Sequence, residues 1–281
     1  MMRVGLIPDE KGGTYRLAML ALSCLGLLIA ALPVVIVVIM SFAGSNRPSF
    51  PPSSYSLRWY GDVLHMLTTA DANGGQSVAR ALQTSLIVAF AVMVISAAVC
   101  VPLSYAMARG PARLRQTLEI LFTLPLVFPL VMLGIAFLLM AEGMKLDLGL
   151  WRLIIPHVTL VLPFVMRNCQ SAMAGIDPEV EEAARSLGAP PWRGFLDVVV
   201  PMMRPGILAG LIFALIISFN EFTITFFMYT IDVNTLPIWM YSRTVSSLDP
   251  SVLALSVFII LADSALIILT DKIVAGKASL F

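Results

Sequence analysis

The chain has 281 residues, of which 59% are hydrophobic and only 12% are charged. This charged share is about half of that in soluble globular proteins, so the composition excludes an ordinary soluble domain and indicates a membrane protein. The net charge of +1 excludes bulk electrostatic binding to nucleic acid. The cysteines Cys24, Cys100 and Cys169 all lie in apolar runs without metal or redox spacing. We therefore expect them to be small packed hydrophobic residues, and we expect no metal site.

A short polar N-terminal segment, residues 1–16, precedes six apolar segments that are long enough to cross a bilayer as helices. These expected spans are residues 17–42, 81–108, 117–140, 151–173, 205–228 and 253–273. The first is too long for the core of a cleaved signal peptide, so we expect it to remain. Pro125 and Pro129 each remove a backbone donor from the third span, which is therefore expected to be bent or broken. Residues 17–281 are thus expected to form one all-α transmembrane domain.

The distribution of basic residues predicts the orientation of these spans. Six spans place both termini on the same side, and twelve of the 18 Lys and Arg residues fall on that side. The remaining six fall on the other side. Because basic residues are enriched in cytoplasmic loops, both termini are expected in the cytoplasm.

Residues 177–201, DPEVEEAARSLGAPPWRGFLDVVVP, form a charged island between the fourth and fifth spans, on the side of the termini. Asp177 is suited to cap the first helical amides, and Gly188 offers a left-handed stop before Pro190. The rod between them would be about 15 Å long. A second short helix, starting near Trp192, is expected at an angle beyond the Pro-Pro break. The first rod is expected to carry one shallow apolar face, comprising Val180, Ala183, Ala184 and Leu187.

This island resembles the EAA motif of ABC importer permeases. Glu182, Ala183 and Ala184 are followed at the family spacing by Gly188 and then by Val198-Val199-Val200-Pro201, with Val in place of the usual Ile and Leu. The resemblance implies an all-α membrane protein with six transmembrane helices, in the MetI-like fold of type I importers. It also implies that the coupling residues, which dock on a separate ATPase, are Glu182, Ala183, Ala184, Gly188 and Pro201. The alternative is a helix pair that lies passively on the lipid interface.

Further segments are similar to the second permease of spermidine/putrescine-type importers, namely SLRWY, SFNEF and TLPIWMYS. That resemblance implies a multi-pass protein of the bacterial inner membrane with a second permease, two ATPase subunits and an external substrate-binding protein as partners. The chain itself would bind no cofactor, and the partner ATPase would hydrolyse ATP. The implied substrate is a polyamine such as spermidine or putrescine. Related permeases carry other small solutes, so an opine, an aminoethylphosphonate or an amino-acid-like solute stays open.

Glu221 and Asn220 are the candidates for the substrate pathway. A carboxylate at membrane depth costs about 3 kcal/mol, so Glu221 is expected to face the bundle interior or a water-filled cavity. A structural Glu hydrogen-bonded to a neighbouring helix is the alternative. His157 is expected to be a hydrogen-bonded packing residue, and the sequence suggests no partner for Asp263 in the sixth span.

Other classes of function find less support. The sequence contains no H-E-x-x-H or G-x-S-x-G motif, so no catalytic residue is assigned. It contains no G-x-x-x-x-G-K-[ST] either, so ATP binding by that route is excluded. A secondary carrier is the remaining alternative, although such carriers usually have more spans and inverted repeats.

Overall fold

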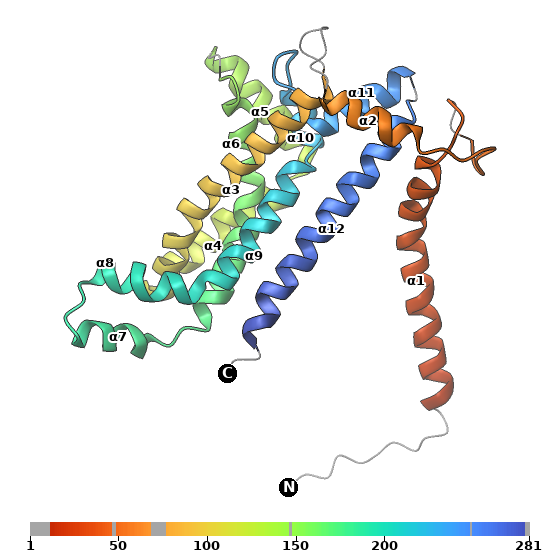
Figure 1. Ribbon diagram of the computed structural model, residues 1–281. Helices are drawn as coiled ribbons and strands as arrows, with labels where there is room; N and C mark the ends of the chain where they lie inside the picture. Colours follow the sequence, from red (N-terminus) through yellow and green to blue (C-terminus); the bar gives the residue numbers. More distant parts are fainter. Residues whose placement is uncertain (1–11, 47–48, 69–76, 146–147, 248, 279–281) are drawn as a thin grey trace. The chain divides into compact units, whose positions relative to one another are not determined.

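The computed structural model describes residues 12–46, 49–68, 77–145, 148–247 and 249–278 (Figure 1). Much of the expected N-terminal segment 1–16 lies outside these residues. The regular elements of the described residues are helices, apart from an isolated bridge between Ala43 and Tyr55. The elements are α1 (Gly12–Ser41), α2 (Arg58–Thr68), α3 (Val78–Arg109), α4 (Ala112–Val127), α5 (Leu130–Met144), α6 (Trp151–Ala174), α7 (Pro178–Ser186), α8 (Pro191–Arg193), the π-helix η1 (Gly194–Val199), α9 (Val200–Phe219), α10 (Thr223–Met228), α11 (Leu236–Ser247) and α12 (Ser251–Ala278).

Within the described residues, five helical stretches are long and apolar enough to cross a membrane. The bent pair of α4 and α5, which meet at 99°, brings the number of spans to six if it is counted as one. The chain breaks at Phe128 and Pro129, which are both extended (ψ 143° and 136°). Pro129 removes a backbone donor and disfavours the helical conformation of the residue before it. The all-α multi-span fold and the broken third span are thus confirmed, whereas Pro125 lies inside α4.

The chain divides into two compact units, and the first comprises residues 1–63 and 248–259. In its described part, the phenol of Tyr60 joins the end of α1 to the start of α2. Its hydroxyl lies 2.7 Å from the hydroxyl of Ser41. The Tyr60 ring packs on Phe42 and Phe258, with centroids 5.3 and 5.6 Å away. The polar hydroxyl and the apolar ring of this residue are therefore both used in packing.

The second unit comprises residues 64–247 and 260–281. Its centre is formed by α3, α6 and α9, which lie side by side (Figure 1). Cys100 and Cys169 are buried in this centre, as expected of packed small hydrophobic residues, whereas Cys24 on α1 is exposed. Fully buried side chains of the centre include Val92, Met107, Leu153, Val161, Val165, Met173, Val199 and Met203.

Close packing of α6 on α9 depends on the absence of a side chain at two glycines. A Cβ atom at Gly206 would lie 2.5 Å from the Cβ of Ala172 and 2.8 Å from the carbonyl oxygen of Asn168. A Cβ at Gly210 would lie 3.1 Å from the Cβ of Asn168. This pair of glycines, four residues apart, is the small-xxx-small pattern of helices that approach closely in membranes.

The fifth span differs from the expected residues 205–228. A continuous helical stretch runs through α8, η1 and α9 from Pro191 to Asn220, and the chain breaks before α10. Pro201 lies in the first turn of α9, where the preceding π-turn shifts the hydrogen bonds and accommodates its missing backbone donor, and Pro205 lies further inside α9. Beyond this break, α10 packs on α5, which is the helix that follows the break in the third span. The expected polar loop after residue 230 contains α11.

Candidate functional site

The helix α7 has the ends that the sequence predicts. The carboxylate of Asp177 accepts a hydrogen bond from the backbone N–H of Glu179 at 3.0 Å, and Pro178 occupies the first turn. After α7, Gly188 adopts φ of +87°, a left-handed conformation that glycine adopts without steric cost. Its N–H donates to the carbonyl of Arg185, and the N–H of Ala189 donates to that of Ala184. The predicted cap and the predicted stop are both confirmed.

The expected apolar face of α7 is not the side by which this helix packs on the bundle. Leu187, the last residue of that apolar face, is 90% exposed, and Ala183 is also exposed. Glu181 is buried instead, with 8% of its surface accessible. A buried carboxylate with several donors outweighs the burial of one or two small apolar side chains on so short a helix.

Glu181 joins α7 to the end of α3. One carboxylate oxygen accepts a hydrogen bond from the Tyr105 hydroxyl at 2.8 Å. The other accepts from the Arg109 guanidinium, with both Nε and Nη2 at 2.8 Å. Arg109 also donates to the backbone carbonyl of Ile176 at 3.1 Å, just before α7. Charge-assisted bonds from two donors to one carboxylate hold α7 firmly on α3.

The second half of the island is also fixed to α3. The expected separate helix near Trp192 is the beginning of the long stretch that continues into α9. Its Phe195 ring packs on the Tyr105 ring at 4.9 Å between centroids. Val199 is fully buried. A displacement of the island would therefore be passed on to α3 and directly to α9.

The residues of the motif lie on the outer side of this island. Glu182, Ala183 and Gly188 are exposed, whereas Ala184 and Pro201 are half-buried. Beside them are two exposed apolar side chains, Leu187 and Trp192, and the latter is 59% exposed. Figure 1 shows α7 and α8 projecting from the bundle of α3, α6 and α9 at the end opposite α10 and α11.

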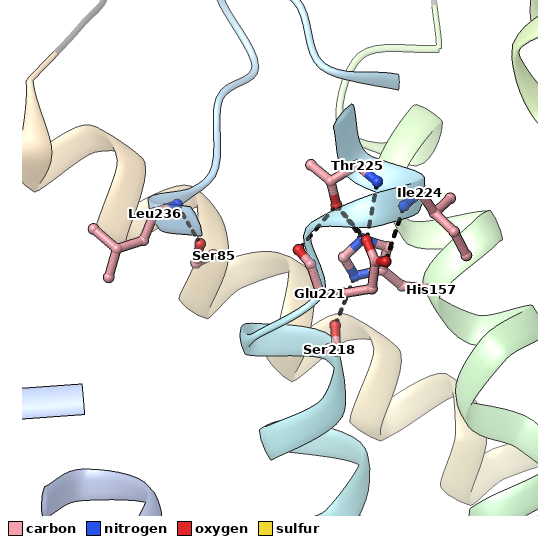
Figure 2. A network of polar contacts seen from close by, with 7 residues as sticks. All are labelled: Ser85, His157, Ser218, Glu221, Ile224, Thr225 and Leu236. Atoms are coloured by element: carbon pink, nitrogen blue, oxygen red, sulfur yellow. Dashed lines mark hydrogen bonds and ion pairs between the residues drawn. The ribbon is translucent and has the colours of Figure 1, made fainter. Parts of the chain in front are cut away.

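The break between α9 and α10 contains Glu221, which is buried, with 6% of its surface accessible. Its carboxylate accepts hydrogen bonds from the backbone N–H groups of Ile224 and Thr225, both at 2.9 Å (Figure 2). The Thr225 hydroxyl donates to the same carboxylate at 2.9 Å. Glu221 thus caps the first turn of α10, where a negative charge is favoured by the helix dipole.

His157 connects α6 to this cap, as expected of a hydrogen-bonded packing residue. Its Nδ1 lies 2.9 Å from the Ser218 hydroxyl, and its Nε2 lies 2.8 Å from the Thr225 hydroxyl. Because Thr225 gives its only proton to Glu221, its oxygen accepts from Nε2, which therefore carries hydrogen. The network in Figure 2 fixes both sides of the α9–α10 break to α6.

The side chain of Asn220 lies toward α12, whereas that of Glu221 lies toward α10. Its side chain is exposed, and its amide donates to the carboxylate of Asp263 on α12 at 2.8 Å and to the carbonyl of Ile216 at 3.0 Å. Asp263, for which the sequence suggested no partner, is half-buried. The two neighbouring pathway candidates are thus separated, because Glu221 faces the α10 cap and Asn220 faces α12.

Two polar pairs of this site were missed from the sequence. The Glu181–Arg109 pair had a usable signal, since a basic residue at the end of one span and an acidic island are predicted on the same side of the membrane. The Asn220–Asp263 pair had only the intramembrane position of Asp263 as a signal, and that did not identify its partner.

The comparisons with known proteins agree with this architecture. Residues 100–276 match the family described as "Binding-protein-dependent transport system inner membrane component". The match covers more than half of the chain, so the chain belongs to this family of ABC transporter permeases. It is a multi-pass membrane component of a transport system and a permease subunit.

Among curated relatives, the chain is 28% identical to the putrescine transport system permease protein PotI of Escherichia coli K12, over 81% of this chain and 80% of that protein. It is 23% identical to the spermidine/putrescine permease protein PotC of the same strain, over 88% and 89%. A solved chain of a bacterial ABC transporter involved in the import of the acidic polysaccharide alginate matches with a TM-score of 0.65 at 16% identity, over 97% of this chain and 99% of that chain. The fold is therefore that of an ABC importer permease.

Proposed function

We propose that this chain forms, with a second permease, the membrane pathway of an ATP-driven importer for a polyamine such as putrescine or spermidine. In this proposal, two copies of a separate ATPase subunit bind in the cytoplasm, and an external binding protein delivers the substrate. Both termini and the island of residues 177–201 would then lie in the cytoplasm, as the basic residues of the sequence suggest.

The observation that carries the proposal is the two-sided construction of α7. Its inner side is held on α3 by Glu181, while its outer side presents Glu182, Ala183 and the exposed Leu187. A short helix that is fixed on one side and presents exposed charged and apolar side chains on the other is suited to fit a groove of a partner protein and to pass on a rigid displacement. This supports a coupling role for Glu182, Ala183, Ala184, Gly188 and Pro201.

The substrate class is supported by the relatives rather than by the fold. PotI and PotC are named for putrescine and spermidine/putrescine transport, and each match covers at least 80% of both chains. The solved alginate importer has the same fold and carries an acidic polysaccharide. Because one fold thus serves substrates of opposite charge, side chains and not the fold must determine what passes.

The test is purification of the assembled importer from native membranes through an affinity tag on this chain. We expect a nucleotide-binding subunit to copurify, and proteoliposomes containing the complex to accumulate labelled putrescine or spermidine only with ATP and the binding protein. Uptake driven by an ion gradient, without a nucleotide-binding partner, would instead identify a secondary carrier. Uptake of an opine, an aminoethylphosphonate or an amino acid in place of polyamines would retain the importer and change its substrate.

The docking surface has its own test. Leu187→Asp should abolish copurification of the ATPase subunit without unfolding the chain, since the side chain is 90% exposed. Ile231→Asp is the matched control, because Ile231 is a similarly exposed apolar residue, at 77%, in the segment between α10 and α11. Equal retention of the ATPase by both variants would contradict the coupling role of α7.

A further inference from the structure

Asp263 lies in the middle of the membrane-spanning helix α12. The apolar stretch of this helix runs from Ser251 to Lys272, and Asp263 is about 18 Å along it from Ser251. The hydrocarbon core is about 30 Å thick, so this carboxylate lies at central depth. A charge that faced lipid there would cost about 3 kcal/mol, and such residues almost always face the bundle interior or a water-filled cavity.

The break after α9 lies at the same depth, because Asn220 donates its amide hydrogen to Asp263 at 2.8 Å. A helix that ends inside the membrane leaves backbone carbonyls without intrahelical partners, and such irregular backbone is tolerated where it lines a pathway or is covered by protein. The C-terminal end of α9 also carries partial negative charge. Asp263 and the α9 terminus therefore combine to favour a positively charged group.

The other charges near the break do not cancel this field. Glu221 directs its carboxylate to the first turn of α10, so that positive helix end is already capped. The ion pairs found between Arg and carboxylate side chains of the described residues are Arg109–Glu181, Arg115–Glu119 and Arg152–Glu142, and none of them includes Asp263. Within the described part of the chain, the one hydrogen bond that its carboxylate accepts comes from Asn220.

Aromatic side chains follow Asn220 closely in the chain, beginning with Phe222. The Phe222 ring lies 5.2 Å from the Tyr241 ring and 5.6 Å from the Phe226 ring, and Phe226 also contacts Tyr229. Phe226, Tyr229 and Tyr241 are each more than a third exposed. Exposed aromatic faces attract organic ammonium groups, which are less strongly hydrated than metal ions of similar charge. The neighbourhood is suited to an amine that carries several positive charges.

We propose that Asp263, oriented by Asn220, is the carboxylate of this chain that receives an ammonium group of the substrate as it crosses the membrane. This inference rests on the proposed function as an importer permease. It replaces Glu221 as the charged pathway residue and gives Glu221 a positioning role in the α10 cap. Asn220 remains a pathway residue because it holds the Asp263 carboxylate.

The decisive variant is Asp263→Asn in the complete importer, reconstituted with its binding protein. The substituted amide still has an oxygen that accepts from Asn220, so the contact between α9 and α12 persists while the charge is lost. ATP-driven uptake of labelled putrescine and spermidine should fall by about tenfold or more, as expected for the loss of one ionic contact in the pathway. Asp263→Glu should retain most of the uptake, and Asp271→Asn, at an exposed position of the same helix, should match the wild type.

Stimulation of the ATPase by the loaded binding protein distinguishes a pathway role from a structural one. It should persist in Asp263→Asn, because Asp263 lies at central depth on α12, whereas the docking island is held on the end of α3. If the wild type takes up polyamines and Asp263→Asn takes them up equally well, this inference is overturned, whereas the proposed function is not. The inference would also be overturned if Asp263→Asn and Asp263→Glu lost uptake to the same extent and both lost ATPase stimulation as well. A wild-type importer that carries only neutral or anionic solutes would overturn both this inference and the proposed substrate class.

Discussion

The carboxylate of Glu181 and the guanidinium of Arg109 lie 2.8 Å apart and join the island helix α7 to the last turn of α3. Both side chains are largely shielded, at 10% and 25% exposure. The pair is therefore less screened by water and salt than an exposed ion pair. It is the main polar connection between the proposed docking element and the transmembrane bundle.

Glu181→Ala should destabilise the chain and reduce transport. The substitution leaves the donors of Arg109 and Tyr105 without their acceptor, which costs about 1–3 kcal/mol when such groups are shielded from water. Thermal unfolding in detergent measures this loss. Glu182→Ala is the matched control, because this neighbouring carboxylate is exposed and its removal should change the unfolding free energy by less than about 0.5 kcal/mol. Equal stability of the two variants would show that the ion pair contributes little.

Gly188→Val should uncouple transport while the protein still inserts. The backbone at Gly188 has φ of +87°, which is strained for any L side chain and most of all for a β-branched one. The strain, about 1–3 kcal/mol, should displace the turn after α7. ATP-driven uptake and ATPase activity in vesicles are the measurements. Gly194→Ala is the control, since its backbone is helical with φ of −53° and an added Cβ meets nothing within 4 Å. Unchanged uptake and ATPase activity in Gly188→Val would argue against docking at this turn.

Gly206→Ala should force α6 and α9 apart. The added methyl would lie 2.5 Å from Ala172 Cβ and 2.8 Å from a backbone oxygen, so the helices themselves must shift. Overpacking of this kind costs about 1–3 kcal/mol, which a lowered unfolding temperature would report. Gly143→Ala on α5 provides the comparison, because a Cβ there meets nothing within 4 Å. The close packing of α6 on α9 would be in doubt if the two variants unfolded at the same temperature.

Glu221→Ala should lower stability more than Asn220→Ala does. Without the carboxylate, the N–H groups of Ile224 and Thr225 and the Thr225 hydroxyl lose their acceptor in a buried site, at a cost of about 1–3 kcal/mol. Asn220 is exposed, so its truncation should cost less. Unfolding curves of both variants in the same detergent provide the comparison. A stable Glu221→Ala variant would contradict the capping role of this carboxylate.

Much of the fold is determined by short stretches of sequence. Apolar segments long enough to cross a bilayer predict membrane helices, since each such helix satisfies its own backbone hydrogen bonds. The ends of α7 were predictable from Asp177 and Gly188, because a cap and a left-handed turn depend on neighbouring residues only. The break in the third span followed from Pro129 for the same reason.

The tertiary structure decided which polar side chains meet. Glu181 and Arg109 are 72 positions apart in the chain, and Asn220 and Asp263 are 43 apart. No local pattern links such residues, so neither pair could be predicted from periodicity or spacing. Similarly, the continuous helix through Pro201 follows the π-turn η1, and α9 packs against α3 and α6. Sequence therefore determined the helices and their ends, whereas the burial of charge depended on donors that only the folded bundle brings within reach.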